Sequence, residues 1–486
     1  MESTPNVLRL SRLDQTVLRV YVRQLLIFPL SEPGLREDAQ TVLAAGLTAT
    51  LKQFPFLAGT VEVTDISAGT LDVQYPKRID KETVSRIFTV NEQSLEALDY
   101  KILREAGFPP SRLPADILCP TALISHPGMD DQYAEVLTTF AKGKPIPVFA
   151  AQLNFIRGGL IISTHTHHSV VDGTGIAKIY SVWSGWTRSW NNKLIYPEQV
   201  HPAVLNSHRS VLDHLAADAK PMKLPEFRSP NDPGNAPMRN PPYRLSAKLL
   251  VFPAATIAEL AASLSATTNV RISSFTALCA LVWCQVTNAR REAMIKSGIG
   301  KTTLGIAVDH RKRVGQVLPD DYLGNCANGM IISLQLSEIP AASNMNAEHI
   351  APAALALSRN LGEVNLDWFR ARLLELSKRE ISTKWILNLD TQNGPDIFIT
   401  SWQHIGADDA WAIPGTTRAS EETGWGCKPS AIRKPHNMWE GGMQILPRQK
   451  GDAAPFEIPL CLEEGEMERT LHGLRAGNWV QRVVEA

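Results

Sequence analysis

The chain has 486 residues, enough for two or three domains, and its 44% hydrophobic and 20% charged residues are typical of a globular protein with large cores. Basic and acidic residues number 49 each, so the formal net charge is zero, which argues against nucleic acid or an anionic membrane as the main partner. The six cysteines are scattered and form no C-x-x-C pair, which disfavours a zinc ribbon and a dense disulfide scaffold.

The sequence shows no recognisable targeting signal or membrane anchor. Residues 1–5 lack a basic region followed by an apolar run, and no apolar stretch is long enough to cross a bilayer. Residues 484–486 match neither a peroxisomal nor a lipidation signal. We therefore expect a cytoplasmic monomer with reduced thiols.

Strands and helices alternate in the first part of the chain. Apolar and β-branched runs predict strands over 20–29, 148–157 and 160–167, with a hairpin turn at Gly158-Gly159. Apolar residues at helical spacing predict helices over 35–51 and 176–186. Proline-rich residues 205–243 follow, and we interpret them as a crossover between an N-terminal domain (1–204) and a C-terminal domain (244–486). An active-site lid is the alternative interpretation of this crossover.

The turn after the 160–167 strand carries His168 and Asp172 four residues apart, followed by Gly173. A histidine just beyond a strand end can project into a cleft, where we expect His168 to act as a general base. Asp172 can brace the loop or the imidazole, and Gly173 would permit a tight turn. A satisfied structural histidine is the alternative.

The same strand carries His165 and His167 on one face. Neutral imidazoles bind metals, but no cysteine or carboxylate cluster completes a ligand set. We therefore expect no metal at this site.

The second part of the chain repeats the alternation. Predicted strands cover 249–252, 303–308, 330–334, 397–402 and 459–462, and predicted helices cover 256–264, 353–361, 368–376 and 464–474. Ser273 or Ser274 would cap a further helix, whose N-terminus is also a candidate phosphate contact. The basic residues 311–313 are either a solvated face or a second phosphate contact.

Motifs that the sequence lacks disfavour several kinds of chemistry. The sequence contains no G-x-S-x-G elbow, no Walker loop and no G-x-G-x-x-G after a strand. A base without an activated nucleophile beside it indicates that the substrate supplies the nucleophile, as in acyl transfer to an alcohol or amine.

His168 to Gly173 resembles the H-x-x-x-D-G signature of BAHD-type, CoA-dependent acyltransferases. Other segments are similar to the family's ordered elements, and they cover nearly the whole chain: Leu10–Gln15 (L-S-x-L-D-Q), Phe56–Gly59 (P-L-A-G), Ser274–Trp283, Asp309–Arg313 (D-x-R-x-R), Leu323–Asn325 (F-G-N), Thr400–Trp402 (T-S-W) and Glu422–Gly426 (D-F-G-W-G). The opening and the long loops look most like fungal members of the trichothecene 3-O-acetyltransferase type. Glu422 and Thr423 depart from the usual Asp and Phe.

The resemblance implies two similar α/β domains of the chloramphenicol-acetyltransferase type, with mixed sheets and a channel between them. It implies transfer of an acyl group, with acetyl as the expected one, from acyl-CoA to a hydroxyl of a small hydrophobic secondary metabolite. Acyl-CoA would be a cosubstrate, and no cofactor would be bound permanently. A condensation-domain-like enzyme that uses a carrier-bound thioester is the alternative, because His167 to Gly173 also matches H-H-x-x-x-D-G. A non-catalytic binding protein is the third interpretation.

The resemblance also implies roles for particular residues. Thr400 and Trp402 would line the channel opposite His168 and supply oxyanion donors. Arg311 would pair with Glu422, and the turn of Gly424, Trp425 and Gly426 would be structural. The candidate contacts to the cosubstrate are Ser273, Ser274, Arg311 and Asn325.

Overall fold

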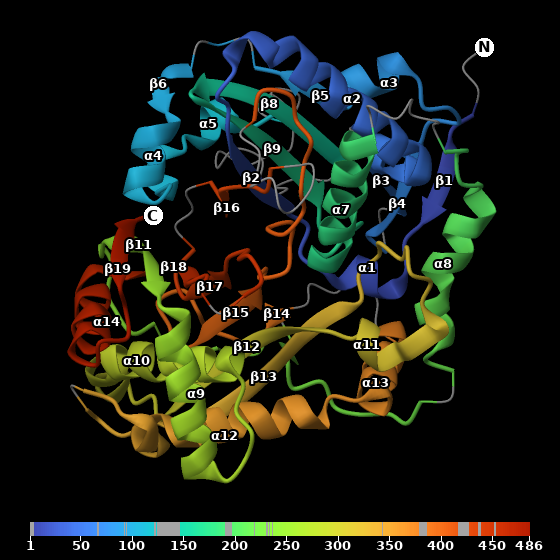
Figure 1. The fold of residues 1–486 in the computed structure, drawn as a ribbon. Helices are drawn as coiled ribbons and strands as arrows, with labels where there is room; N and C mark the ends of the chain where they lie inside the picture. Colours follow the sequence, from blue (N-terminus) through green and yellow to red (C-terminus); the bar gives the residue numbers. More distant parts are fainter. Residues whose placement is uncertain are drawn as a thin grey trace.

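The computed structural model describes residues 4–486 apart from 66–67, 92, 94, 121–122, 124–145, 190–196, 218, 230–231, 233, 236, 343, 379–385, 417–426, 436–438 and 452. Each half of the chain is built on its own mixed sheet, and the two halves stack one above the other (Figure 1). This architecture confirms the predicted fold class of two α/β parts with mixed sheets.

The first half is built on a six-stranded sheet in the order β16-β2-β9-β8-β5, with β6 beside β8. Its strands are β2 (Tyr21–Pro29), β5 (Phe88–Val90), β6 (Leu95–Asp99), β8 (Phe149–Arg157), β9 (Gly159–His167) and β16 (Ala431–Arg433). The pairing of Ile156 with Gly159 confirms the predicted hairpin but moves its turn one residue earlier, to Arg157-Gly158. The hairpin carries the chain directly into the His168 loop.

Helices α2 (Arg36–Gln53) and α7 (Gly173–Ser189) cover one face of this sheet. They pack closely, because a Cβ at Gly46 would lie 2.8 Å from Thr187 Cγ2, and the Trp183 indole donates to the Leu43 carbonyl at 2.9 Å. Helices α4 (Tyr100–Ala106) and α5 (Ala115–Leu118) lie against the other face. Helix α2 ends before Pro55, as proline predicts.

A four-stranded sheet and two short helices complete the first half. The sheet runs β1-β4-β3-β7, and the bounds are β1 (Asn6–Arg9), β3 (Thr60–Asp65), β4 (Thr70–Tyr75), β7 (Ile146–Pro147), α1 (Arg12–Thr16) and α3 (Lys81–Ile87).

The second half is built on a seven-stranded sheet in the order β13-β12-β15-β17-β18-β11-β19. Its strands are β11 (Leu245–Phe252), β12 (Lys301–Asp309), β13 (Ala327–Gln335), β15 (Ile397–Ser401), β17 (Gly442–Ile445), β18 (Phe456–Glu463) and β19 (Arg482–Glu485). The short edge strand β19, which pairs with β11, was not predicted from the sequence.

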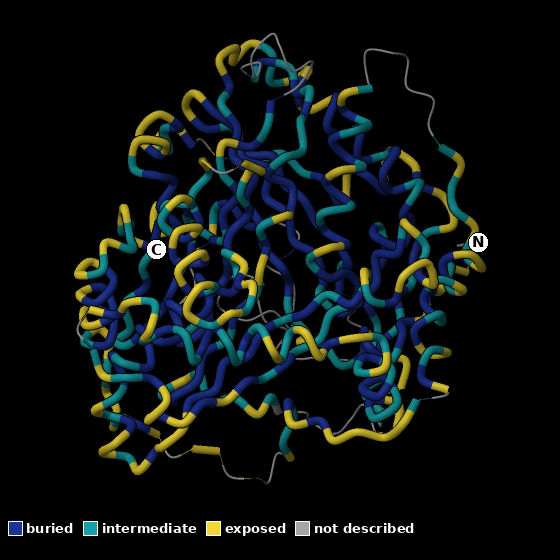
Figure 2. Tube along the Cα trace, turned by 60° about the horizontal axis from the view of Figure 1, so that its bottom comes forward, coloured by how far each residue is buried: buried dark blue, intermediate teal, exposed yellow. Residues whose placement is uncertain are grey.

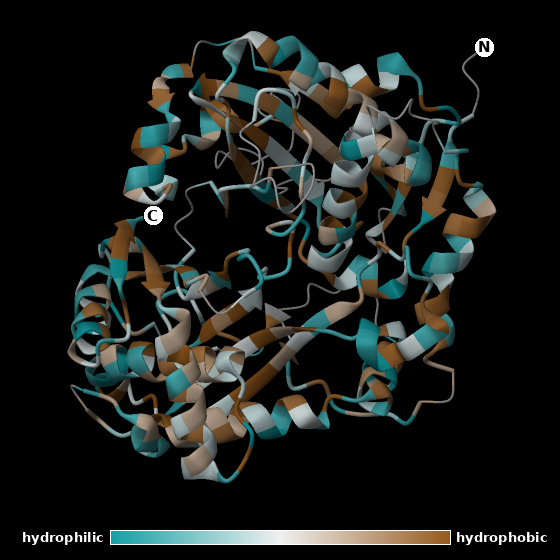
Figure 3. Ribbon diagram, in the orientation of Figure 1, coloured by the Kyte–Doolittle hydropathy of each residue, from teal (hydrophilic) through white to brown (hydrophobic). Residues whose placement is uncertain are grey.

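Helices cover one face of the second sheet and enclose its apolar core. They are α9 (Ala254–Thr268), α10 (Ser274–Lys296), α12 (Ala347–Glu363) and α14 (Glu464–Ala476), while α11 (Arg311–Val314) and α13 (Leu366–Ser377) lie at the end nearer the first half. Buried segments run through the middle of both halves (Figure 2), and apolar residues occur on both the strands and the helices of each half (Figure 3). A fully buried Leu or Phe side chain contributes about 1.5–3 kcal/mol, so these cores supply the main stabilising term.

The crossover is more structured than its proline content indicates. Helix α8 (Pro202–His214) covers the start of the predicted 205–243 loop, with Pro202 at its first turn, where a missing N–H costs nothing. Further on, β10 (Phe227–Arg228) pairs with β14 (Ile386–Leu387). The crossover is therefore a helix followed by a segment fastened to the second half.

A segment of the second half returns to the first. Strand β16 pairs antiparallel with β2, and Ile405, Trp411 and Ile432 belong to the first-half core. The predicted C-terminal domain of 244–486 therefore does not form one separate unit, because part of it completes the N-terminal sheet.

No described helix has the length and apolar character needed to span a bilayer. A small cavity of about 40 Å³ lies between the halves, lined by Pro110 from the first half and by Trp439, Gln444 and Cys461 from the second. None of its lining residues belongs to the His168 loop, so the predicted channel stays a prediction.

We predict that Arg433 holds strand β16, which the second half of the chain supplies, against the first half. Its buried guanidinium donates to the Gly107 and Phe108 carbonyls at 3.1 and 3.0 Å and to Glu457 at 2.9 Å. Arg433→Ala should lower the free energy of unfolding in urea by about 3–5 kcal/mol, because it leaves buried acceptors unpaired.

The matched control is Arg157→Ala, which breaks an exposed ion pair with Glu96 and should cost at most about 1 kcal/mol. An equal loss in the two variants would contradict the fastening role of Arg433.

Candidate active site

His168 opens the loop 168–172, which joins β9 to α7. Its backbone N–H donates to the Val20 carbonyl at 2.9 Å, and its own carbonyl accepts from the Asn325 side-chain amide at 2.8 Å. The residue is partly exposed, whereas its Nδ1 is buried and has no hydrogen-bond partner among the described residues. Nε2 is therefore the ring nitrogen that a substrate can reach.

Asp172 closes the loop and is only 2% exposed. Its carboxylate accepts from the two Nη atoms of Arg311 at 2.8 and 2.9 Å, and from the backbone N–H groups of Gly175 and Cys326, both at 2.9 Å. None of the four donors is His168, so Asp172 holds the loop and the start of α7 instead of relaying charge to the imidazole.

Arg311 pairs with Asp172, and the described residues do not test its expected pairing with Glu422. Besides Asp172, its guanidinium reaches Asp309 at 3.2 Å and the Gly324 carbonyl at 2.7 Å. Burial lowers the pKa of Arg311, but the ion pair with Asp172 outweighs burial and leaves this pKa raised. The predicted partner Glu422 lies outside the described residues, as do Gly424, Trp425 and Gly426. Because its two Nη atoms are held inside the protein, Arg311 is poorly placed to bind a phosphate.

The other candidate contacts to a cosubstrate differ in accessibility. Ser273 is exposed and caps α10, accepting from the Thr276 N–H at 3.1 Å, which confirms the predicted cap, and Ser274 is the first residue of that helix. Asn325 is 0% exposed, and its side-chain amide donates to Asp14 and to the His168 carbonyl. The structure thus favours a supporting role for Asn325 over contact with a cosubstrate.

The predicted role of Gly173 in the turn is wrong. Gly173 starts α7 and has no positive φ, and a Cβ there would meet only Ile405, at 3.2 Å. The tight position is Gly175, where a Cβ would lie 2.6 Å from both the Leu323 carbonyl and Val171 Cγ1. A side chain at Gly175 would push the loop away from the second half.

Thr400 and Trp402 lie at the end of β15, and their surroundings differ. The strand ends at Ser401, and the Trp402 N–H donates to the Ile445 carbonyl at 2.8 Å. Trp402 is 9% exposed and packs in the first-half core, whereas Thr400 is partly exposed on the second sheet, in register with Gln444. This geometry favours the packing alternative for Trp402.

His165 and His167 flank the ring of Tyr21, at centroid distances of 6.0 and 5.6 Å. Within the described ranges no group of three or more potential ligands comes together around a metal position. Nδ1 of His167 accepts from the Ser169 N–H at 3.2 Å. Burial, reinforced by His168 and Arg19, lowers the pKa of His167 to about 3, so this imidazole is neutral at physiological pH.

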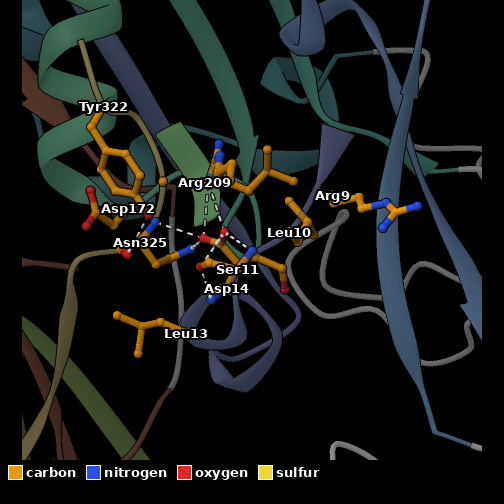
Figure 4. A network of polar contacts seen from close by, with 12 residues as sticks. Arg9, Leu10, Ser11, Leu13, Asp14, Asp172, Arg209, Tyr322 and Asn325 are labelled. Carbon is orange, nitrogen blue, oxygen red and sulfur yellow. Dashed lines mark hydrogen bonds and ion pairs between the residues drawn. The ribbon is translucent and has the colours of Figure 1, made fainter. Parts of the chain in front are cut away.

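Sequence reasoning missed two residues beneath the loop, Asp14 and Arg209. Both side chains are buried, and they form an ion pair at 3.0 Å (Figure 4). The only signal in the sequence was the Leu10–Gln15 segment, which carried no assigned role. Arg209 lies in a stretch that we expected to be a loop.

The buried histidines predict a pH dependence of stability. The pKa values of His167 and His310 are lowered to about 3 and 4, in each case mainly by burial, against 6.5 for a free side chain. Between these values the unfolded chain binds more protons than the folded protein, so stability falls as the pH drops below 6.5. From pH 6.5 to 5 each histidine should remove about 2 kcal/mol from the free energy of unfolding.

The variant His310→Phe tests this expectation, because the ring stacks on Phe369 at 4.1 Å and phenylalanine keeps the stacking. Urea unfolding at several pH values should show a shallower slope for this variant than for the wild type. His214→Gln, at the exposed end of α8, is the control and should keep the slope. An unchanged slope in His310→Phe would overturn the expectation.

The fold and the loop define a protein of two α/β halves with a histidine presented between them, and known proteins share the fold. Residues 123–472 match the model of the Transferase family, and residues 20–185 match the trichothecene 3-O-acetyltransferase-like N-terminal domain. Trichothecene 3-O-acetyltransferase TRI101 of Fusarium sporotrichioides is 24% identical over 93% of this chain and 92% of its own length. Acyltransferase easC of Emericella nidulans is 26% identical over 96% of this chain and 93% of its own.

Among solved structures, F. sporotrichioides TRI101 complexed with coenzyme A and T-2 superposes with a TM-score of 0.73. It is 21% identical and covers 98% of this chain and 99% of its own, so the likeness is one of fold. The chain belongs to the Transferase family. It is an acyltransferase of the BAHD type that its motifs predicted, and the fungal relatives agree with the resemblance of its opening and long loops.

Proposed function

We propose that the protein transfers an acyl group, acetyl in the first instance, from acyl-CoA to a hydroxyl of a small hydrophobic secondary metabolite. The observation that carries the proposal is His168, a partly exposed histidine with buried Nδ1, on a loop that is held from beneath by buried ion pairs. The relatives support it, because TRI101 is named as a trichothecene 3-O-acetyltransferase and one solved structure of it is a complex with coenzyme A and T-2. Acyl-CoA is a cosubstrate in this proposal, and no cofactor is bound permanently.

In the proposed reaction His168 Nε2 takes the proton of the acceptor hydroxyl while its oxygen attacks the thioester carbonyl. The tetrahedral intermediate collapses by breaking the C–S bond, and the imidazolium returns the proton to the departing CoA thiolate. The products are an ester and free CoA, and the enzyme ends the cycle unchanged. Asp172 keeps the loop in shape throughout, because its oxygens are bonded to Arg311 and to two backbone amides.

Two further expectations belong to this proposal. The six cysteines are all described and buried, and no disulfide joins them, which supports a reducing cytoplasmic compartment. The neutral net charge supports small molecules rather than nucleic acid as partners, and we propose a monomer. The condensation-domain alternative gains no support from relatives named as acetyltransferases and acyltransferases.

The base is tested with His168→Ala. Loss of a general base lowers turnover by about two to four orders of magnitude, while binding of CoA should be kept. Release of CoA thiol from acetyl-CoA, measured with a panel of hydrophobic alcohols, gives kcat, and calorimetry gives the affinity for CoA.

The control is His214→Ala, an exposed histidine at the end of α8. Thiol release that needs no acceptor, or a full rate in His168→Ala, would contradict the proposal. Transfer only from a carrier-bound thioester would favour the condensation alternative.

The oxyanion donor is tested with two variants at the end of β15. Thr400 is the better candidate because the residue is partly exposed, whereas Trp402 packs in a core. Thr400→Val should lower kcat by about a hundred- to a thousand-fold with little change in Tm. Trp402→Phe should keep kcat and lower Tm, since it changes packing alone.

The reverse pattern, with kcat lost in a stable Trp402→Phe protein, would return the oxyanion role to the indole. Unchanged kcat in both variants would move the search to a backbone amide.

A further inference from the structure

The carboxylate of Asp14 is fully buried, and the proposed reaction gives it no task. It lies in α1, in the Leu10–Gln15 segment. Its oxygens accept from the Ser11 N–H and hydroxyl at 2.9 and 2.8 Å, from the Asn325 backbone and side-chain amides at 2.8 and 2.9 Å, and from Arg209 Nη1 at 3.0 and 3.1 Å. Figure 4 shows Arg209 and Asn325 reaching this one carboxylate from two different elements.

Two of these partners continue to the histidine loop. The Asn325 side-chain amide also donates to the His168 carbonyl at 2.8 Å, and Arg209 Nη2 donates to the Val170 carbonyl at 2.8 Å. The carbonyls on both sides of Ser169 are therefore held by side chains that Asp14 itself orients. Asp172 fixes the far end of the loop independently, through Arg311.

Arg209 lies in a site shaped for its guanidinium. The group lies over the rings of Phe56 and Tyr322, at 5.3 and 5.7 Å from their centroids. A Cβ at Gly324 would collide with Arg209 Nη1, so only glycine fits beside it. Three of the family-like segments thus meet here: Leu10–Gln15, Phe56–Gly59 and Leu323–Asn325.

Stability alone does not explain such a pair. The Arg209 and Asp14 side chains are 4% and 0% exposed, and the desolvation of a buried ion pair offsets most of its attraction. The pair does fix the position of the loop, because Arg209 donates to the Val170 carbonyl, and Asn325, which Asp14 accepts from, donates to the His168 carbonyl. Each end therefore limits where the backbone that carries His168 can move.

We propose that Asp14 is a positioning residue for the His168 base, acting through Asn325 on the His168 carbonyl and through Arg209 on the Val170 carbonyl. The proposal rests on the proposed function, in which His168 takes the acceptor proton. Asp14 touches neither substrate nor the reacting atoms. It keeps Nε2 at the place where the acceptor hydroxyl arrives.

The test combines Asp14→Asn with Arg209→Lys. Asp14→Asn keeps the shape of the side chain but removes the charge that Arg209 and Asn325 share. Arg209→Lys keeps a cation against Asp14, but a single ammonium cannot span both Asp14 and Val170, so this variant serves if Asp14→Asn folds poorly. Each variant is made in the wild type and in His168→Ala, and kcat, both KM values and Tm are measured well below the melting transition.

We expect each variant to lower kcat by about ten- to a hundred-fold, since a displacement of about 1 Å costs up to a hundred-fold. Both KM values should change less than about three-fold. In the His168→Ala background the same substitutions should change the residual kcat less than about two-fold, because a residue that acts through His168 has nothing left to position. The control Asp396→Asn removes another buried carboxylate, bonded to the Thr303 and Asp390 N–H groups, and should not alter kcat.

A second readout does not depend on turnover. Diethyl pyrocarbonate modifies accessible imidazoles, and mass spectrometry follows its reaction with His168. A loosened loop should make His168 react several-fold faster in Asp14→Asn and in Arg209→Lys than in the wild type.

Wild-type kcat and wild-type reactivity of His168 in a folded variant would overturn the proposal. An equal loss of kcat in both backgrounds would also overturn it, because that pattern indicates a general structural defect. If the wild type transfers no acyl group, or His168→Ala turns over at the full rate, the proposed function fails instead. The reactivity of His168 then still decides whether Asp14 holds the loop.

Discussion

The ion pair between Asp172 and Arg311 joins the histidine loop of the first half to the second half of the chain. Asp172 is only 2% exposed, and a carboxylate at such depth needs a full set of donors. It finds them in Arg311 and in the backbone N–H groups of Gly175 and Cys326, so the loop, the start of α7 and the start of β13 meet at one carboxylate. The shape of the site therefore depends on how the two halves dock.

The docking is secured at two other places. Strand β16 is supplied by the second half and pairs with β2 of the first, where Arg433 ties it to the Gly107 and Phe108 carbonyls. Asn325, in the segment just before β13, reaches Asp14 and the His168 carbonyl. Because these ties come from separate segments of the second half, the histidine is held by the assembled fold and not by its own loop alone. Such preorganisation suits a base that must meet an incoming hydroxyl.

Local signals in the sequence were sufficient for much of the fold. The 3.6-residue and two-residue periods located α2, α7, β2, β8 and β9, the Ser273 cap was recognised from its residue type, and the His168–Asp172 spacing identified the candidate base. The family motifs then supplied the expected class, which the family match confirms.

What the sequence could not supply were contacts between distant residues. Spacing alone does not predict that Arg311 pairs with Asp172, which lies far from it in sequence. Strand β16 has three residues, too few for a period to be visible, and its partner β2 lies some four hundred residues earlier. The prolines of the crossover led us to predict a loop where α8 lies, so Arg209 was not recognised as part of a helix. The role of Asp14 depends on partners from α8 and from the segment just before β13, which are distant from it in sequence.

Crystal structures of the protein with and without bound coenzyme A would test most directly whether the histidine loop is preformed. We predict that Arg311 stays within hydrogen-bond distance of Asp172 in both structures, with the loop 168–172 unchanged and Nε2 of His168 facing the thioester end of the cosubstrate. An Arg311 side chain that leaves Asp172 to bind a phosphate of coenzyme A, with the loop rearranged, would contradict it.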